Sequence, residues 1–507
     1  MKKKLWFFAV LFIAISLLVY VTGCEENDSN GNNNGNLDIP SVLIGEWAPK
    51  TSPKTMLFKI TSDGTFIASE HSAGLSDSFD KLTVSGSTVE LSGNVGTFNF
   101  SISNGEMSMT NATGSALLFS LNSPFVKFDS GSVTSYTITS PYSNVNWVAD
   151  GQFKTALHNH TTASDGSATL PQMVEEHYSQ DYDVLAITDH SYGPTRTDAL
   201  ALPVTIDWVS HYRPPHEIPL TQQRNEEVQT GTGRNDRGML PIPNSSEILF
   251  AGREEINTFF FYHEIATPMS AGEPALRNVL AQVRDADGLA QLNHPGRSTG
   301  GLVFGPPGTA ASNNPRWINY YSKLFHDFPV MVGMEIINRR DEDSVSDRIL
   351  WDNILKVIIP IGQRNVWGFS NTDAHSNSYD RVSSSFNMFI MPENNMENVK
   401  STMVNGNFYA VARIARHELG NNMNTPRSGP FPTITNIVVT NNESANAAIT
   451  ITAEHYDLIK WISNGAEIAE GNSITLGDYA ENIGVYVRAN IIGPGGISFT
   501  QPFIVTK

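Results

Sequence analysis

Two histidines one residue apart, His158 and His160, lie in the stretch "ALHNHTTASDG", and Asp165 follows them in a predicted turn. Side chains at positions i and i+2 of a strand point to the same side, so these two imidazoles can bind one cation together. Zinc, manganese and iron all accept mixed imidazole and carboxylate ligands. One such pair is weak support, because most pairs of this kind are surface residues without a ligand. The other metal-capable residues must therefore decide the interpretation.

Four further apolar runs lead into side chains that can bind metals. These runs are "VLAIT", "ILFAG", "GLAQL" and "VWGFS", and the side chains that follow them include Asp189, His190, Glu254, Glu255, His294, Asp373 and His375. The carboxyl ends of the strands in a parallel α/β barrel converge on one face, where active sites of such barrels lie. Asp373 and His375 repeat the i, i+2 spacing of the first pair.

Each of these histidines taken singly is better explained as a buried, hydrogen-bonded residue. Gathered at one barrel face without a cation, they would leave charges and ring nitrogens unpaired. The sequence therefore predicts a metal centre, to which His263 belongs least clearly. The remaining histidines of this region are expected on the surface or behind the ligands: His177, His211, His216, His326 and His417.

The elements that must position these residues alternate between strand and helix from 148 to 420. "TLPQMVEEHYSQ" and "PALRNVLAQVRDAD" predict helices between the apolar runs, which is typical of parallel strands with crossover helices. Residues 41–126 consist of short alternating runs separated by SDG, SGS and SNG turns, and predict a small antiparallel, lipocalin-like β domain. Residues 430–507 return to alternating runs and predict a β-sandwich-like domain.

The whole chain has 507 residues, with 40% hydrophobic and 17% charged residues, and a net charge of −18. Such an acidic chain disfavours sequence-independent binding to nucleic acid. Residues 1–23 combine three lysines with an apolar run and predict a lipoprotein signal peptide, with Cys24 as the lipidated residue. The alternative is an uncleaved membrane helix. Residues 24–40 predict a flexible tether, and the protein is expected to be exported and anchored to a membrane through Cys24.

The ordered motifs "LHNHTTASDG", "AITDH", "GREEINT", "NHPGR" and "NTDAH" resemble the polymerase and histidinol phosphatase (PHP) superfamily of metal-dependent phosphoesterases, over roughly residues 150–415. The resemblance implies an α/β fold, a distorted seven-stranded β/α barrel, with two or three divalent ions (Zn, Mn or Fe). It implies one ion on His158, His160, Glu254 and Asp373. It implies a second on Glu254, as the bridging ligand, with His263 and His294, and a third on Asp165, His190 and His375.

This chain departs from the family in two respects. Glu255 follows Glu254 where an aliphatic residue is common, so the bridging ligand could be either glutamate. The segment between His190 and Glu254 is long and predicts an insertion over the site, so the substrate does not follow from the resemblance.

The expected reaction is hydrolysis of a small phosphoester, with Glu254 and Asp373 holding the ions and Arg297 binding a phosphate oxygen. A surface ion pair explains Arg297 equally well. Two other functions remain open. One is hydrolysis of a non-phosphate ester or amide on the same fold, and the other is a non-catalytic binding lipoprotein.

Overall fold

The computed structural model describes the chain from residue 135 onward with gaps, and only short segments before it. The described ranges are 43–49, 58–60, 66–68, 82–85, 88–91, 96–103, 106–112, 124–127, 135–190, 207–209, 219–250, 254–261, 272–299, 312–341, 344–362, 364–420 and 425–507. The predicted signal peptide, Cys24, the tether and His263 lie outside these ranges. Within them, no helix is both long enough and apolar enough to cross a membrane.

The N-terminal strands form one antiparallel sheet in the order β3-β2-β1-β8-β7-β6-β5-β4. Trp47, Phe58 and Phe125 are buried on it, with ring centroids of Trp47 and Phe58 6.5 Å apart and those of Phe58 and Phe125 5.1 Å apart. The strands are β1 (Gly45–Pro49), β2 (Phe58–Ile60), β3 (Phe66–Ala68), β4 (Leu82–Ser85), β5 (Thr88–Leu91), β6 (Gly96–Ser103), β7 (Glu106–Thr110) and β8 (Phe125–Lys127).

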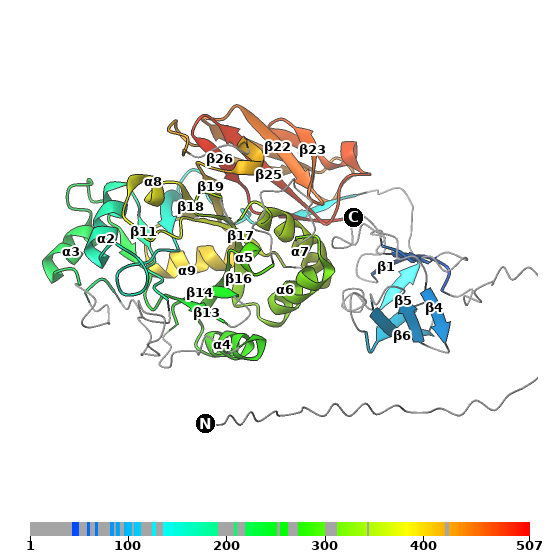
Figure 1. Ribbon diagram of the computed structural model, residues 1–507. Helices are drawn as coiled ribbons and strands as arrows, with labels where there is room; N and C mark the ends of the chain where they lie inside the picture. Colours follow the sequence, from blue (N-terminus) through cyan, green and yellow to red (C-terminus); the bar gives the residue numbers. More distant parts are fainter. Residues whose placement is uncertain are drawn as a thin grey trace, which may run out of the picture. The chain divides into compact units, whose positions relative to one another are not determined.

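A larger sheet continues from the α/β region into the C-terminal residues (Figure 1). Its main path is β12-β11-β10-β18-β19-β26-β25-β22-β23, and β27 and β9 pair at its side. Its strands are β9 (Thr137–Thr139), β10 (Gly151–Ala156), β11 (Val184–Leu185), β12 (Leu240–Pro241), β18 (Ser385–Met391), β19 (Phe408–Ala412), β22 (Leu458–Ser463), β23 (Ala466–Glu470), β25 (Tyr486–Gly493), β26 (Gly496–Phe499) and β27 (Phe503–Thr506).

A second, five-stranded sheet has the order β13-β14-β15-β16-β17. Its strands are β13 (Ser246–Leu249), β14 (Glu255–Phe259), β15 (Leu289–Asn293), β16 (Met331–Asn338) and β17 (Trp367–Asn371). β14 runs antiparallel to both β13 and β15, whereas β15, β16 and β17 are parallel. Two isolated bridges join residues of this region to the larger sheet: Asn159 with Ala374, and His190 with Glu247.

The architecture is therefore mixed α/β with additional β sheets. In the α/β region the described strands belong to two of these sheets, which are linked by the two isolated bridges, and a closed barrel is not seen among the described residues. Strand β14 was not predicted from the sequence, and it returns from β13 as a hairpin and lies antiparallel between β13 and β15.

Helices pack against the five-stranded sheet, with α4 on β15 and with α6 and α7 on β16. The N-cap of α2 is Thr169, and the side chains of Thr169 and Gln172 each accept a hydrogen bond from the other residue's backbone amide. The helices are α2 (Leu170–Ser179), α3 (Gln222–Thr230), α4 (Glu273–Asp285), α5 (Gly296–Thr299), α6 (Pro315–Asp327), α7 (Asp347–Gly362), α8 (Tyr379–Val382), α9 (Met396–Asn405) and α10 (Arg416–Leu419).

The C-terminal strands do not form a free-standing sandwich. β26 is hydrogen-bonded directly to β19, so this part of the chain extends the larger sheet. A separate three-stranded sheet contains β20 (Thr433–Thr440), β21 (Ala448–Glu454) and β24 (Ser473–Thr475), and a 3-10 helix follows at Leu476–Tyr479. One buried apolar cluster contains α2 residues such as Met173 together with Ile449 and Trp461, so the two parts share a core.

Candidate metal centre

The segment that follows β10 brings the first two histidines together. The Nε2 atoms of His158 and His160 lie 3.0 Å apart, and both side chains are fully buried. Asn159 between them points the other way, and its amide donates to the carbonyl oxygen of Ala186 at 3.0 Å. The i, i+2 spacing therefore places both imidazoles on one side, as predicted, while Asn159 fixes the strand to its neighbour.

Two carboxylates face this pair of histidines. Glu247 Oε2 lies 3.2 Å from His158 Nε2 and 3.1 Å from His160 Nε2. Asp373 Oδ1 lies 3.5 Å and 3.2 Å from the same two nitrogens. Ligands about 2.1 Å from one metal ion stand roughly 3.0–3.4 Å from one another. The spacing of these four atoms therefore matches a coordination shell.

The β13–β14 hairpin decides which glutamates face the centre. Leu249 pairs with Glu255 and Glu247 pairs with Asn257, so Glu247 and Glu255 lie on the same face. Glu254 precedes the strand by one residue and has different neighbours. Its charge interacts with Glu273 and Arg316, and burial raises the pKa of its carboxyl. The structure thus places Glu247 where the resemblance implied Glu254.

His294 follows β15 and lies beside both hairpin glutamates. Its Nε2 is 3.4 Å from Glu247 Oε1 and 3.5 Å from Glu255 Oε2. Ligand atoms of His158, His294 and Asp373 also lie within 4.8 Å of one another. Glu247 and Glu255 thus take the positions around His294 that the resemblance implied for Glu254 and His263.

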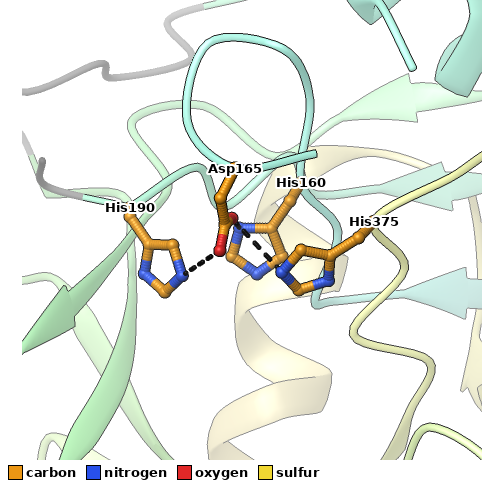
Figure 2. Close-up of side chains that lie close together, drawn as sticks. All are labelled: His160, Asp165, His190 and His375. Atoms are coloured by element: carbon orange, nitrogen blue, oxygen red, sulfur yellow. Dashed lines mark ion pairs between the residues drawn. The ribbon is translucent and has the colours of Figure 1, made fainter. Parts of the chain in front are cut away.

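The third group consists of His160, Asp165, His190 and His375, which converge in Figure 2. Asp165 Oδ2 is 3.5 Å from His190 Nε2, and its Oδ1 is 3.2 Å from His375 Nε2. Asp165 reaches this place because Thr161 and Ser164 donate hydrogen bonds to the buried carboxylate of Asp189, which shapes the loop. The structure therefore brings together the three residues predicted for a third ion and adds His160.

Glu335 of β16 lies behind the histidines. Its Oε1 accepts from His158 Nδ1 at 2.7 Å, and its Oε2 accepts from the backbone amide of His294 at 2.9 Å. A carboxylate on Nδ1 keeps the proton there and leaves Nε2 as the ligand atom. Glu335 thus orients one histidine and the loop that carries another.

The charges of the centre shift the pKa values of its members. Burial lowers the pKa of His158, but Glu247, Asp373 and Glu335 outweigh it and raise this pKa well above its usual range. Burial also lowers the pKa of His160, but hydrogen bonds to Asp373 and Glu247 outweigh burial and raise this pKa to about 10. The carboxylates therefore favour proton uptake by these imidazoles when no ion is bound, so ion binding and proton release are coupled here.

Two arginines border the centre. Arg297 Nη2 and Arg339 Nε lie 3.3 Å and 3.0 Å from Asp373 Oδ2. Their side chains are 22% and 28% exposed, so both guanidinium groups are reachable from solvent. Arg297 therefore lies at the centre, and Arg339 is a second basic residue there.

Sequence reasoning overlooked Glu247, Glu335 and Arg339. Glu247 lies in "SSEILFAGREE", and recognising this stretch as a hairpin would have placed its residues 247 and 255 on one face. Glu335 is the lone acid in the otherwise apolar run "VMVGMEIIN", which is a signal for a buried functional carboxylate. The donor sets as a whole are consistent with a multinuclear site that binds divalent ions through nitrogen and oxygen.

No family model matches this chain, and no curated protein matches it by sequence. Solved structures show distant similarity. One is a two-domain protein from Bacteroides vulgatus containing a predicted PHP-like metal-dependent phosphoesterase, with 12% identity, a TM-score of 0.35, and coverage of 71% of this chain and 88% of that chain.

Two other solved structures are similar over about half of this chain. The lesion-specific endonuclease EndoQ from Pyrococcus furiosus has 14% identity and a TM-score of 0.30, and covers 50% of this chain and 56% of that chain. An amidohydrolase from Chromobacterium violaceum has 14% identity and a TM-score of 0.25, and the match covers 44% of this chain and 87% of that chain. The chain is thus distantly similar in structure to PHP-like phosphoesterases and to an amidohydrolase.

Proposed function

We propose that this protein is a metal-dependent hydrolase that cleaves a small phosphoester. The observation that carries the proposal is the convergence of His158, His160, Glu247 and Asp373, with ligand atoms 3.0–3.5 Å apart. Around them, the overlapping groups described above supply donors for two or three divalent ions. The identity of the metal among Zn, Mn and Fe does not follow from these ligands.

The side chains divide into those that hold ions and those that hold the substrate. When bound, divalent ions supply Lewis acidity and make water acidic enough to lose a proton near neutral pH. Glu335 keeps the proton of His158 on Nδ1, so that Nε2 points at the centre. Arg297 and Arg339 would bind the non-bridging oxygens of the phosphoryl group and stabilise its charge in the transition state.

The basic residues favour a phosphoester over a neutral ester or amide. Two guanidinium groups beside one carboxylate give the centre a binding edge for an anion, whereas a neutral substrate does not require it. Hydrolysis of a carboxylic ester or amide is the rival, because the ions would serve that reaction equally well.

Elemental analysis and an activity panel test the proposal. The full-length protein should carry two or three divalent ions per chain and hydrolyse phosphomonoesters or phosphodiesters with added Mn, Zn or Fe. Asp373→Asn should lose both metal and activity, because it removes a charge from the centre. Arg297→Ala should keep the metal but raise KM or lower kcat.

The outcomes separate the rival functions. Turnover of carboxylic esters or amides alone would assign the rival hydrolase. Bound metal without turnover of any substrate class would favour a binding protein. Less than about one ion per chain, with no recovery on adding Mn or Zn, would overturn the metal centre itself.

A further inference from the structure

A second concentration of basic side chains lines an open pocket of about 690 Å³. Lys154, Arg234, Arg237 and Arg413 contribute to its wall, with Asp181 as an acidic neighbour. None of the candidate metal residues lines this pocket. In a chain with a net charge of −18, such a gathering of cations is a local feature and not a property of the surface in general.

Lys154 contributes a partly buried ammonium group. Its Nζ lies 4.1 Å from the ring centroid of Tyr182 and 4.7 Å from that of Phe386, and it donates to the carbonyl oxygen of Gln180 at 2.8 Å. Burial, and then the positive charge of Arg413, lower the pKa of Lys154 to about 7. The protonated ammonium group is thus destabilised by its surroundings, and a bound anion would offset this.

Arg234 and Arg413 use only part of their guanidinium groups in the protein. Arg234 Nη1 donates to the carbonyl oxygen of Tyr182 at 2.7 Å, and Arg413 Nη1 donates to that of Gly429 at 2.9 Å. The Nε atoms of both arginines are buried and have no hydrogen-bond partner among the described residues. The nearest acid to Arg234 Nε is Asp181 at 3.6 Å, and the side chain of Asp181 is 83% exposed.

Arg237 lines the same pocket but differs from Arg234 and Arg413, because a carboxylate pairs with its guanidinium group. Its Nε and Nη2 bind the two carboxylate oxygens of Asp183 at 2.5 Å and 2.6 Å, so its charge is matched by the protein. The charges of Lys154 and Arg413 have no carboxylate partner of this kind in the described chain, and that of Arg234 has only long contacts, with Asp181 at 3.6 Å and with Asp183 at 3.4 Å.

We propose that this pocket is a second anion site that binds a small tetrahedral oxyanion of the phosphate class. Such an anion would accept hydrogen bonds from the Arg234 and Arg413 guanidinium groups and would reduce the repulsion between them and Lys154. The pocket volume is within the usual range of small-molecule sites, so the anion could be free phosphate or the phosphate of a larger ligand. The site is separate from the proposed hydrolytic centre and does not depend on it.

Calorimetric titration of the full-length, metal-depleted protein with inorganic phosphate at constant ionic strength tests the proposal. The wild type should bind phosphate, and Arg234→Gln and Arg413→Gln should each weaken binding about tenfold or more, as loss of a charge-assisted hydrogen bond does. Arg284→Gln, which removes an exposed arginine outside the pocket, should leave binding unchanged. A phosphate monoester in place of phosphate separates a larger ligand from the free ion, because tighter binding of the ester would identify the larger ligand.

Three results would overturn the proposal. Binding that is equal in the wild type and Arg234→Gln would exclude the pocket, and this variant decides the matter if Arg413→Gln does not fold. Loss of binding in Arg297→Gln would assign the phosphate to the metal centre. Acetate binding as tightly as phosphate would exclude a preference for a tetrahedral oxyanion.

Discussion

At the residue scale, Glu254 and Glu255 are neighbours in the chain with opposite surroundings. Glu255 begins β14 on the face of Glu247, and its carboxylate lies 3.5 Å from His294 Nε2. The carboxylate charge of Glu254 instead interacts with the charges of Glu273 and Arg316. The alternation of side chains along a strand is the cause, because it separates adjacent residues onto two faces.

This difference gives a matched pair of variants. Glu255→Gln should weaken metal binding at least tenfold, because it removes a charged donor from the cluster around His294. Glu254→Gln makes the same carboxylate-to-amide change one residue away, and this variant should bind metal like the wild type. Competition with a chelator of known affinity measures both constants, and metal loss in Glu254→Gln alone would contradict the assignment.

His177 predicts a pH dependence of stability. It is fully buried in α2, where its Nδ1 donates to the carbonyl oxygen of Met173 at 2.7 Å and its ring packs on Tyr182, so the expectation of a surface residue or one behind the ligands is wrong. Burial lowers its pKa from 6.5 to about 4. The unfolded chain thus binds this proton more tightly, and the stability present above pH 6.5 should be lost as the pH falls towards 4.

The magnitude follows from the shift in pKa. About 3 kcal/mol of unfolding free energy should disappear between pH 6.5 and 4, since each pKa unit corresponds to about 1.4 kcal/mol. His177→Leu removes the titrating group, and urea unfolding at several pH values should show a flatter profile for the variant. Parallel profiles for the variant and the wild type would exclude this role of His177.

At the element scale, the close approach of β16 to β17 depends on a glycine. A Cβ atom at Gly333 would lie 2.2 Å from the carbonyl oxygen of Trp367 and 2.7 Å from the ring of Phe369. Both contacts are far inside the van der Waals distance, and one of them is to the backbone. These two strands precede Arg339 and Asp373, so their spacing also positions the centre.

Gly333→Ala should therefore destabilise the protein by about 1–3 kcal/mol, because the two strands must move apart. Gly362→Ala is the control, since a Cβ atom there would meet only the flexible side chain of Arg364, at 3.3 Å. Urea denaturation of both variants measures the difference. Equal midpoints would show that β16 and β17 accommodate the methyl group without cost.

At the scale of the whole molecule, a buried ionic network joins α7 to the C-terminal strands. Asp352 Oδ1 accepts from Tyr486 OH at 2.7 Å and from Arg488 Nε at 2.9 Å, and its Oδ2 accepts from Arg488 Nη2 at 2.8 Å. All three side chains are buried, so bulk water is a poor substitute for the carboxylate as a partner of the guanidinium group.

Asp352→Asn should cost about 3–5 kcal/mol of unfolding free energy, because it leaves the Arg488 charge buried without a counter-charge. Asp457→Asn alters an exposed aspartate of the same C-terminal region and should change stability by less than about 0.5 kcal/mol. Thermal or urea unfolding compares the two. A small effect of Asp352→Asn would mean that Arg488 finds another partner.

The prediction that the protein is exported rests on residues outside the described ranges. If Cys24 is lipidated, Cys24→Ser should leave an unprocessed precursor or release the protein into the soluble fraction. Membrane fractionation with immunoblotting measures this. A variant that fractionates and migrates like the parent protein would favour an uncleaved membrane helix.

Most residues of the candidate centre could be predicted from local patterns in the amino-acid sequence. The i, i+2 pairs and the polar residues after apolar runs identified His158, His160, His190, His294, Asp373 and His375, which the structure brings together. They were readable because strand periodicity is a local property, and each signal spans only a few residues. The alternation of "DVLAITDH" and "GLAQLNHP" with helical segments likewise indicated the α/β region.

Features that depend on pairing between distant segments could be seen only in the folded structure. It showed that β14 is antiparallel, and therefore that Glu247 and Glu255 face the centre while Glu254 does not. It also placed Glu335 behind His158, 177 residues away in sequence, and joined β26 to β19 in one sheet. Strand partners and register are fixed by contacts far apart in the chain, so local periodicity specifies a strand's faces but not which of them meets the site.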